Sequence, residues 1–189
     1  MQMSYREIIT ALHGIGFGGL FLLAFSGALI GIFRVCTIDT SSSPSVCERK
    51  FLRIYFITMV VFAWGTVLSG AYLVYPWYRA RPPQGITDYT EYPQRSLLSS
   101  PTTAGWHNVG MEWKEHVAWF APIAITMVAY VFIKYGSDLS RHRQVRKAAF
   151  AFTVVAFIAA GIAGTFGALI NKKAPVQGGT VIKLMEETK

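Results

Sequence analysis

The sequence predicts an all-α, multi-pass membrane protein built as a four-helix bundle, with a long surface loop between helices 2 and 3. Three observations lead to this fold class. Of the 189 residues, 52% are hydrophobic and only 15% are charged. The mean hydropathy is +0.37. The apolar residues collect in separate runs, each long enough to supply the roughly 20 helical residues that cross a bilayer.

The apolar runs define the expected membrane spans, which are residues 8–33, 54–75, 117–133 and 148–170. Between the second and third runs lies a polar stretch rich in proline, which predicts a long irregular loop on the membrane surface. What remains is too short for a soluble domain of ordinary size. Residues 1–189 are therefore expected to form a single integral-membrane domain.

Local signals predict where helices begin, bend and end. Ser4 and Glu7 have the spacing of a capping box at the start of the first helix. Pro122 lacks an amide hydrogen and is expected to kink the third helix. Gly136 is a candidate C-terminal stop for that helix, and Ser140 is a candidate N-cap for the fourth.

The formal net charge of +8 does not indicate a nucleic-acid partner, because nearly all basic residues lie in connections or at helix ends. Membrane proteins keep basic residues there, in contact with the lipid bilayer. Nine basic residues lie in or beside the two short connections, whereas the other nine are spread over the termini and the long loop. The positive-inside rule then places both termini and the long loop outside, in a membrane of the bacterial inner (plasma) type.

Cys36 and Cys47 bracket the serine-rich connection after the first run. In an oxidising compartment they could form a disulfide, which would argue for the opposite orientation; otherwise they are free thiols. A metal site is not expected there, because no further cysteine and no nearby histidine completes one.

His13 stands at the front of the first run, in the glycine-rich stretch Leu12–Leu20. An ionisable side chain inside a membrane is costly and is a functional hypothesis by default. Glycines beside it let a helix or a flat cofactor approach the backbone. Gly14 and Gly18 from this run, with Gly164 from the fourth, are therefore candidate cofactor-binding residues. Close helix packing is the alternative interpretation.

His116 lies at a depth comparable to that of His13. At 1.5 Å per residue, His13 is about 31 Å from Arg34 at the far end of its helix, and His116 is about 27 Å from Lys134. Helices one and three run in the same direction, so both imidazoles are expected near the same membrane face. Glu112, one turn before His116, could accept a hydrogen bond from it and fix its tautomer.

Two imidazoles at one level of a bundle suit one haem b with two axial histidines. His13 and His116 are the candidate ligands of the haem iron, and His107, just before the third run, is the alternative ligand. A quinone could bind near Trp113, Trp119 and the proline kink.

With His13, its glycines and His116 in a four-helix layout, the chain resembles the small membrane-embedded b-type cytochrome subunits of respiratory and photosynthetic oxidoreductases. The resemblance covers the layout and no diagnostic motif. It departs from the larger cytochrome b pattern, in which one helix carries two histidines about a dozen residues apart. The resemblance therefore implies at most one haem on one side of the membrane, and at most the role of an electron-transfer subunit in an oxidoreductase.

Two classes of function follow. In the first, the chain binds haem b and carries electrons within a larger membrane complex, with a quinone as a candidate electron partner. In the second, it is a cofactor-free structural or assembly subunit whose glycine faces and aromatic loop contact other membrane-protein subunits. The sequence contains no P-loop, nucleophile elbow or HExxH motif. No clear internal repeat of the transporter kind is present either.

Overall fold

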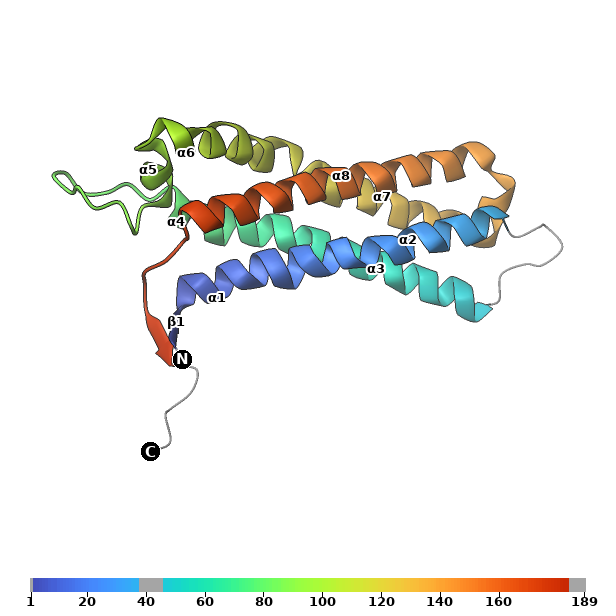
Figure 1. Cartoon of the computed structure of the whole chain (residues 1–189). Coiled ribbons are helices and arrows are strands. Elements are labelled where there is room, and N and C mark those ends of the chain that lie inside the picture. The colour runs from blue at the N-terminus through green and yellow to red at the C-terminus, as the bar shows by residue number, and fades with distance from the viewer. Residues whose placement is uncertain (1, 38–45, 184–189) are drawn as a thin grey trace.

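Four long helices lie side by side along the molecule (Figure 1). This computed structural model describes residues 2–37 and 46–183. Within those residues, four helices are long and apolar enough to cross a membrane: Tyr5–Arg34, Lys50–Tyr78, Pro101–Tyr135 and Arg143–Lys173. The predicted fold class, an all-α transmembrane bundle, is confirmed. The first and last described residues, in β1 and β2, and the long loop between the second and third spans lie at one end of the bundle (Figure 1).

Several of the spans are built from consecutive segments of different helical type. Segments η1 to η4 are π-helical and η5 is a 3₁₀ helix. In chain order the elements are β1 (Gln2–Ser4), α1 (Tyr5–Ala11), η1 (Leu12–Gly19), α2 (Leu20–Thr37), α3 (Val46–Ser69), η2 (Gly70–Val74), α4 (Tyr75–Tyr78), α5 (Pro93–Leu98), α6 (Pro101–Gly105), η3 (Trp106–Met111), η4 (Trp113–Val117), α7 (Phe120–Tyr135), η5 (Gly136–Arg141), α8 (Arg143–Lys173) and β2 (Val181–Lys183).

The spans, of 29 to 35 residues, extend beyond the predicted apolar runs. Intrahelical hydrogen bonds continue into polar end residues, which a hydropathy criterion leaves out. The capping box is confirmed: the Glu7 amide donates to Ser4 Oγ at 3.2 Å, and the Ser4 amide donates to Glu7 Oε2 at 2.7 Å. Gly136 ends α7 with a φ of +49°, as predicted. Ser140 is not the cap of α8, because that helix begins at Arg143 with His142 in the N-cap position.

Pro122 lies in the first turn of α7, where the lack of an amide hydrogen has little cost. The interruption of the third span falls just before it, at Ala118–Trp119, which form a turn rather than helix. The helix is therefore interrupted between η4 and α7, just before Pro122.

Two hydrophobic clusters hold the bundle together. The larger one lies in the half of the bundle that is farther from the termini, and its centre includes Phe56, Ile125 and Val128, each at most 1% exposed. In it, the rings of Phe56 and Phe132 are 4.4 Å apart. The smaller cluster joins the end of α8 to the long loop and consists of Tyr78, Leu97, Met111, Ile170, Ala174 and Val176.

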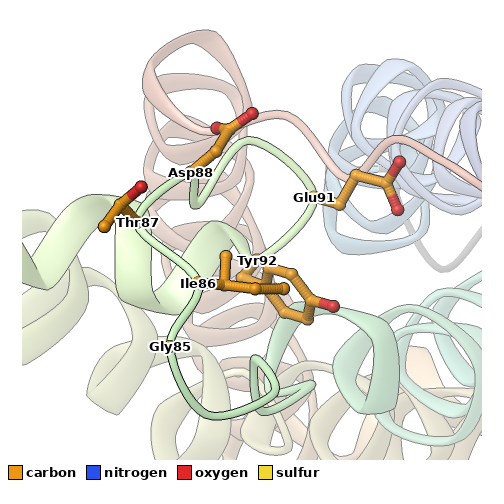
Figure 2. A pocket seen from close by; sticks show the side chains of 6 residues that line it. All are labelled: Gly85, Ile86, Thr87, Asp88, Glu91 and Tyr92. Atoms are coloured by element: carbon orange, nitrogen blue, oxygen red, sulfur yellow. The ribbon is translucent and has the colours of Figure 1, made fainter.

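The long loop is not irregular throughout, because α5 and α6 are helical and α6 leads directly into the third span. Its first part curls around an open hollow lined by Gly85–Asp88, Glu91 and Tyr92 (Figure 2). The Asp88 carboxylate accepts hydrogen bonds from the Thr90 hydroxyl and, at 2.9 Å, from the Thr90 amide. These bonds hold the pKa of Asp88 below its usual value.

The two ends of the described chain pair with each other. Strands β1 and β2 run antiparallel, with Met3 opposite Ile182. The Tyr5 amide donates to the Thr180 carbonyl at 2.9 Å, so the pairing continues to the start of α1. The Arg6 guanidinium lies over the Trp77 ring, 5.8 Å from its centroid, and links this end to the second span. The predicted pairing state of Cys36 and Cys47 lies outside the part of the chain whose side chains are described.

Candidate functional site

A π-helical layer occurs in the first three spans. We use that name for segments η1, η2, η3 and η4, which belong to the three spans that meet near the termini. π-helical turns are rare and occur frequently at functional sites. Segments η1, η2 and η4 contain no buried residue, whereas Gly110 and Met111 of η3 are buried. Three of the four segments are therefore less buried than the two clusters.

Three of the four histidines belong to this layer: His13 lies in η1, His107 in η3 and His116 in η4. The fourth, His142, is exposed at the other end of the bundle, next to the start of α8. His13 and His116, the two histidines predicted to lie at a comparable depth, both lie in π-helical segments, which the sequence pattern did not indicate.

His13 lies against the second span. Its Nδ1 is 2.8 Å from the Thr66 carbonyl oxygen and 3.2 Å from Ser69 Oγ. A carbonyl can only accept, so Nδ1 carries the hydrogen and Nε2 has a free lone pair. Within the described residues, Nε2 of His13 makes no hydrogen bond. Every fully enclosed side-chain nitrogen or oxygen among these residues has a hydrogen-bond partner, so Nε2 is not fully enclosed. The lone pair of Nε2 is therefore available to bind a metal ion.

His116 has the same donor arrangement on a different surface. Its Nδ1 is 3.0 Å from the Glu112 carbonyl oxygen and 3.4 Å from Glu112 Oε2. Glu112 thus supplies the acceptor that the spacing predicts. This bond again leaves Nε2 free. The His116 side chain, however, is 71% exposed.

The structure does not bring His13 and His116 into contact. His13 lies against Thr66 and Gly70 of the second span. The only polar contacts of His116, within the described part of the chain, are to Glu112 of its own helix. The side chain of the third span that reaches inward at this level is instead Lys114, whose Nζ lies over Gly167 of α8. Residues two apart on a helix point to nearly opposite sides, so an inward Lys114 is accompanied by an outward His116.

His107 uses both of its ring nitrogens. Nδ1 is 2.7 Å from the Tyr78 hydroxyl, and Nε2 is 3.2 Å from Gln94 Nε2. These bonds join η3 to α4 and to α5 of the long loop. As the alternative iron ligand, His107 would have to give up one of them, whereas His13 and His116 would not.

The candidate cofactor-binding glycines have different surroundings. A Cβ on Gly14 would meet nothing within 4 Å. At Gly18 it would be 3.5 Å from Thr66 Cγ2, and at Gly164 it would be 3.7 Å from Leu22 Cδ1, both of which are ordinary contacts. Gly14 alone of these three faces open space.

At two other glycines, side chains of the chain itself fill the space next to the backbone. A Cβ on Gly65 would lie 2.9 Å from the Phe17 ring, and one on Gly70 would lie 2.6 Å from His13 Cε1. These glycines serve helix packing, which agrees with the alternative interpretation of the small residues.

The residues proposed to lie near a quinone are in separate contacts. Trp113 Nε1 donates to the Ala159 carbonyl at 3.4 Å. The rings of Trp119 and Trp64 are edge-on, with their centroids 6.3 Å apart. Pro122 is buried in α7. Among the described residues, no group of three or more His, Cys, Asp or Glu side chains could hold a metal ion.

The sequence analysis did not single out Lys114, Thr66 or Ser69. Lys114 was counted only as one basic residue near a helix end, although its position two residues before His116 implies that the two side chains point apart. Thr66 contributes its carbonyl group rather than its side chain to His13, so its identity carries no signal for that contact.

No protein-family model, curated protein or solved structure matches the chain. The functional argument therefore rests on the geometry of the π-helical layer.

Proposed function

We propose that the chain is a haem-b-binding subunit that takes part in electron transfer within a larger membrane complex, with His13 as an axial ligand of the haem iron. The observation that carries this proposal is the hydrogen bond from His13 Nδ1 to the Thr66 carbonyl. Axial histidines depend on such an acceptor, because it fixes the tautomer and the ring orientation. When bound, haem supplies one-electron redox chemistry.

The chain's own residues have distinct roles in this proposal. Thr66 and Ser69 orient the His13 imidazole, and Nε2 is the donor atom toward iron. Gly70 leaves room for the imidazole against the second span. Gly14 faces the open space in which a flat group meets no side chain of this segment.

His116 is proposed as the second ligand on the basis of its Nδ1 bond to Glu112 and its free Nε2. Its fit to a haem inside the bundle is poorer than that of His13, because its side chain is 71% exposed. An exposed imidazole suits a haem held at an interface with a neighbouring subunit. A quinone near Trp113 and Trp119 is the proposed electron partner.

A second candidate function is a cofactor-free structural or assembly subunit. The specific observation in its favour is that Gly65 and Gly70 accommodate Phe17 and His13. Much of the space that small residues create is therefore filled by the chain itself. In this case His13 is a packed, hydrogen-bonded side chain, and any cofactor belongs to a partner.

The finer localisation is also a proposal. Four candidate spans indicate an integral membrane protein. The dense basic residues of the two short connections favour a bacterial-type inner membrane with both termini and the long loop outside.

An ultraviolet–visible spectrum of the purified chain separates the two functions. We expect a reducible Soret and α band that is lost in His13→Ala, because the iron loses its oriented ligand. His142→Ala is the matched control, since His142 is exposed at the other end of the bundle, and its spectrum is expected to be unchanged.

Two further variants assign the second ligand. Loss of the bands in His116→Ala supports His116, whereas loss in His107→Ala alone identifies His107 instead. A correctly folded, colourless wild-type protein would contradict the haem proposal and favour the structural subunit.

A further inference from the structure

Lys114 is a basic side chain that reaches into the bundle and has no partner among the described residues. It lies in η4 and is partly buried, with protein on most sides of its ammonium group. The Lys114 Nζ lies 2.7 Å from the position that a Cβ on Gly167 would occupy. The ammonium therefore fills the space that a side chain at Gly167 would take, and α8 can accommodate it there because residue 167 is glycine.

No anion among the described residues pairs with this ammonium. Glu112, two residues before it, is paired with His116. Lys114 takes part in no hydrogen bond or ion pair within the described part of the chain. A charge taken out of water without a partner is strongly unfavourable, so a bound anion would stabilise this arrangement.

The Lys114 ammonium is not fully enclosed by protein. Among the described residues, every fully enclosed side-chain nitrogen or oxygen has a hydrogen-bond partner. Lys114 Nζ has no such partner, so it is open at one edge. His13 lies in η1 of the same π-helical layer. An incoming ligand could therefore meet a cation and a free imidazole nitrogen in the same layer of the bundle.

The depth of the site indicates which anions are available. Gly167 lies about 9 Å from the end of α8 at Lys173. Because α8 is about 46 Å long and the hydrocarbon layer is about 30 Å thick, each end of a centred helix projects about 8 Å beyond that layer. Lys114 Nζ therefore lies near the boundary between hydrocarbon and headgroups, where phospholipid phosphates occur.

We propose that Lys114, seated over Gly167, is a binding position for an anionic oxygen group of a membrane-borne ligand. Two sources share this chemistry: the phosphate of an anionic phospholipid and a carboxylate of haem. Only the second source rests on the proposed function. The first is independent of it, so the site can be tested in a chain that carries no haem.

Native mass spectrometry of the detergent-solubilised chain, titrated with phosphatidylglycerol, tests the phospholipid source. Lys114→Met removes the charge, and Gly167→Ala places a methyl group where the ammonium lies. Both are expected to weaken phosphatidylglycerol binding roughly tenfold relative to phosphatidylcholine, as for the loss of one charged hydrogen bond.

Each variant has a matched control. Lys173→Met removes the same charge at the same end of the bundle from an exposed side chain. Gly161→Ala makes the same change in α8 where nothing lies within 4 Å. Both controls are expected to bind phosphatidylglycerol like the wild type. If Lys114→Met does not fold, as judged by circular dichroism, Gly167→Ala decides the question, because alanine favours helix.

The haem source is tested on the same variants. This test applies if the chain purifies with haem. If Lys114→Met and Gly167→Ala then lower the reduction potential or the retention of haem, and lipid binding does not change, the anion is a haem carboxylate. A colourless wild type contradicts the proposed function, while the lipid titration still tests the site. Variants that match their controls in lipid binding and in haem properties would overturn the inference.

Discussion

At the scale of single residues, the His13 imidazole packs against a glycine of another helix. The sequence directs attention to the glycines that surround His13, such as Gly14 and Gly18. In the structure, the glycine in closest contact with the imidazole is Gly70, where a Cβ would lie 2.6 Å from Cε1. The imidazole cannot easily move away, because its Nδ1 is held by the Thr66 carbonyl. Its place therefore depends on a contact between segments 53 residues apart in sequence.

Gly70→Ala tests this contact. We expect it to destabilise the bundle by about 1–3 kcal/mol, as is typical of overpacking, because the added methyl group displaces the imidazole from Thr66. The measurement is the apparent Tm in detergent, followed by circular dichroism. Gly14→Ala is the control, since a Cβ there meets nothing within 4 Å and alanine favours helix. Equal Tm values for the two variants would contradict the assignment of Gly70.

At the scale of elements, local sequence determines the helix ends better than the helix interiors. The capping box at Ser4 and the positive φ at Gly136 form as predicted, because each depends on neighbours within a few residues. The π-helical segments were not predicted. An extra residue in a helical turn alters the phase of every side chain after it, and no local motif marks that change.

Ser4→Ala tests the start of the first span. It removes the acceptor for the Glu7 amide and is expected to cost about 1 kcal/mol in local stability. Hydrogen exchange of the first turn of α1, measured by mass spectrometry, is expected to speed up. Glu7→Gln is the control, because glutamine also completes a capping box. Unchanged exchange in Ser4→Ala would show that the pairing of β1 with β2 holds this turn without the cap.

At the scale of the whole molecule, the hydrophobic packing is divided between two clusters. One holds the membrane bundle together, and the other attaches the long loop to the end of α8. The π-helical layer is joined to both, because Met111 of η3 belongs to the smaller cluster and Val117 of η4 packs against the larger one. Figure 1 shows β1, β2 and the long loop at one end, and the end of α2 and the end of α7 at the other.

Thiol labelling tests how this arrangement lies in the membrane. In a background with Cys36→Ser and Cys47→Ser, a membrane-impermeant maleimide is added to sealed right-side-out vesicles. The thiol introduced by Thr87→Cys, in the long loop, is expected to react, whereas that of Asp138→Cys, in η5, is expected to be protected until detergent is added. Both sites are exposed, so protection reports the membrane rather than burial. The reverse pattern would contradict the proposed orientation.

The sequence by itself determined the fold class, the four spans and the presence of His13, His107 and His116 toward one end of the bundle. These features depend on hydropathy, helical rise and local caps, which act over a few neighbouring residues. Only the tertiary structure decided which way each imidazole points. It places His13 against Gly70 and turns His116 outward, with Lys114 reaching inward in its place. The direction in which each side chain points depends on the rotation of its helix about the helix axis and on contacts between distant segments. Local sequence patterns do not specify either of these.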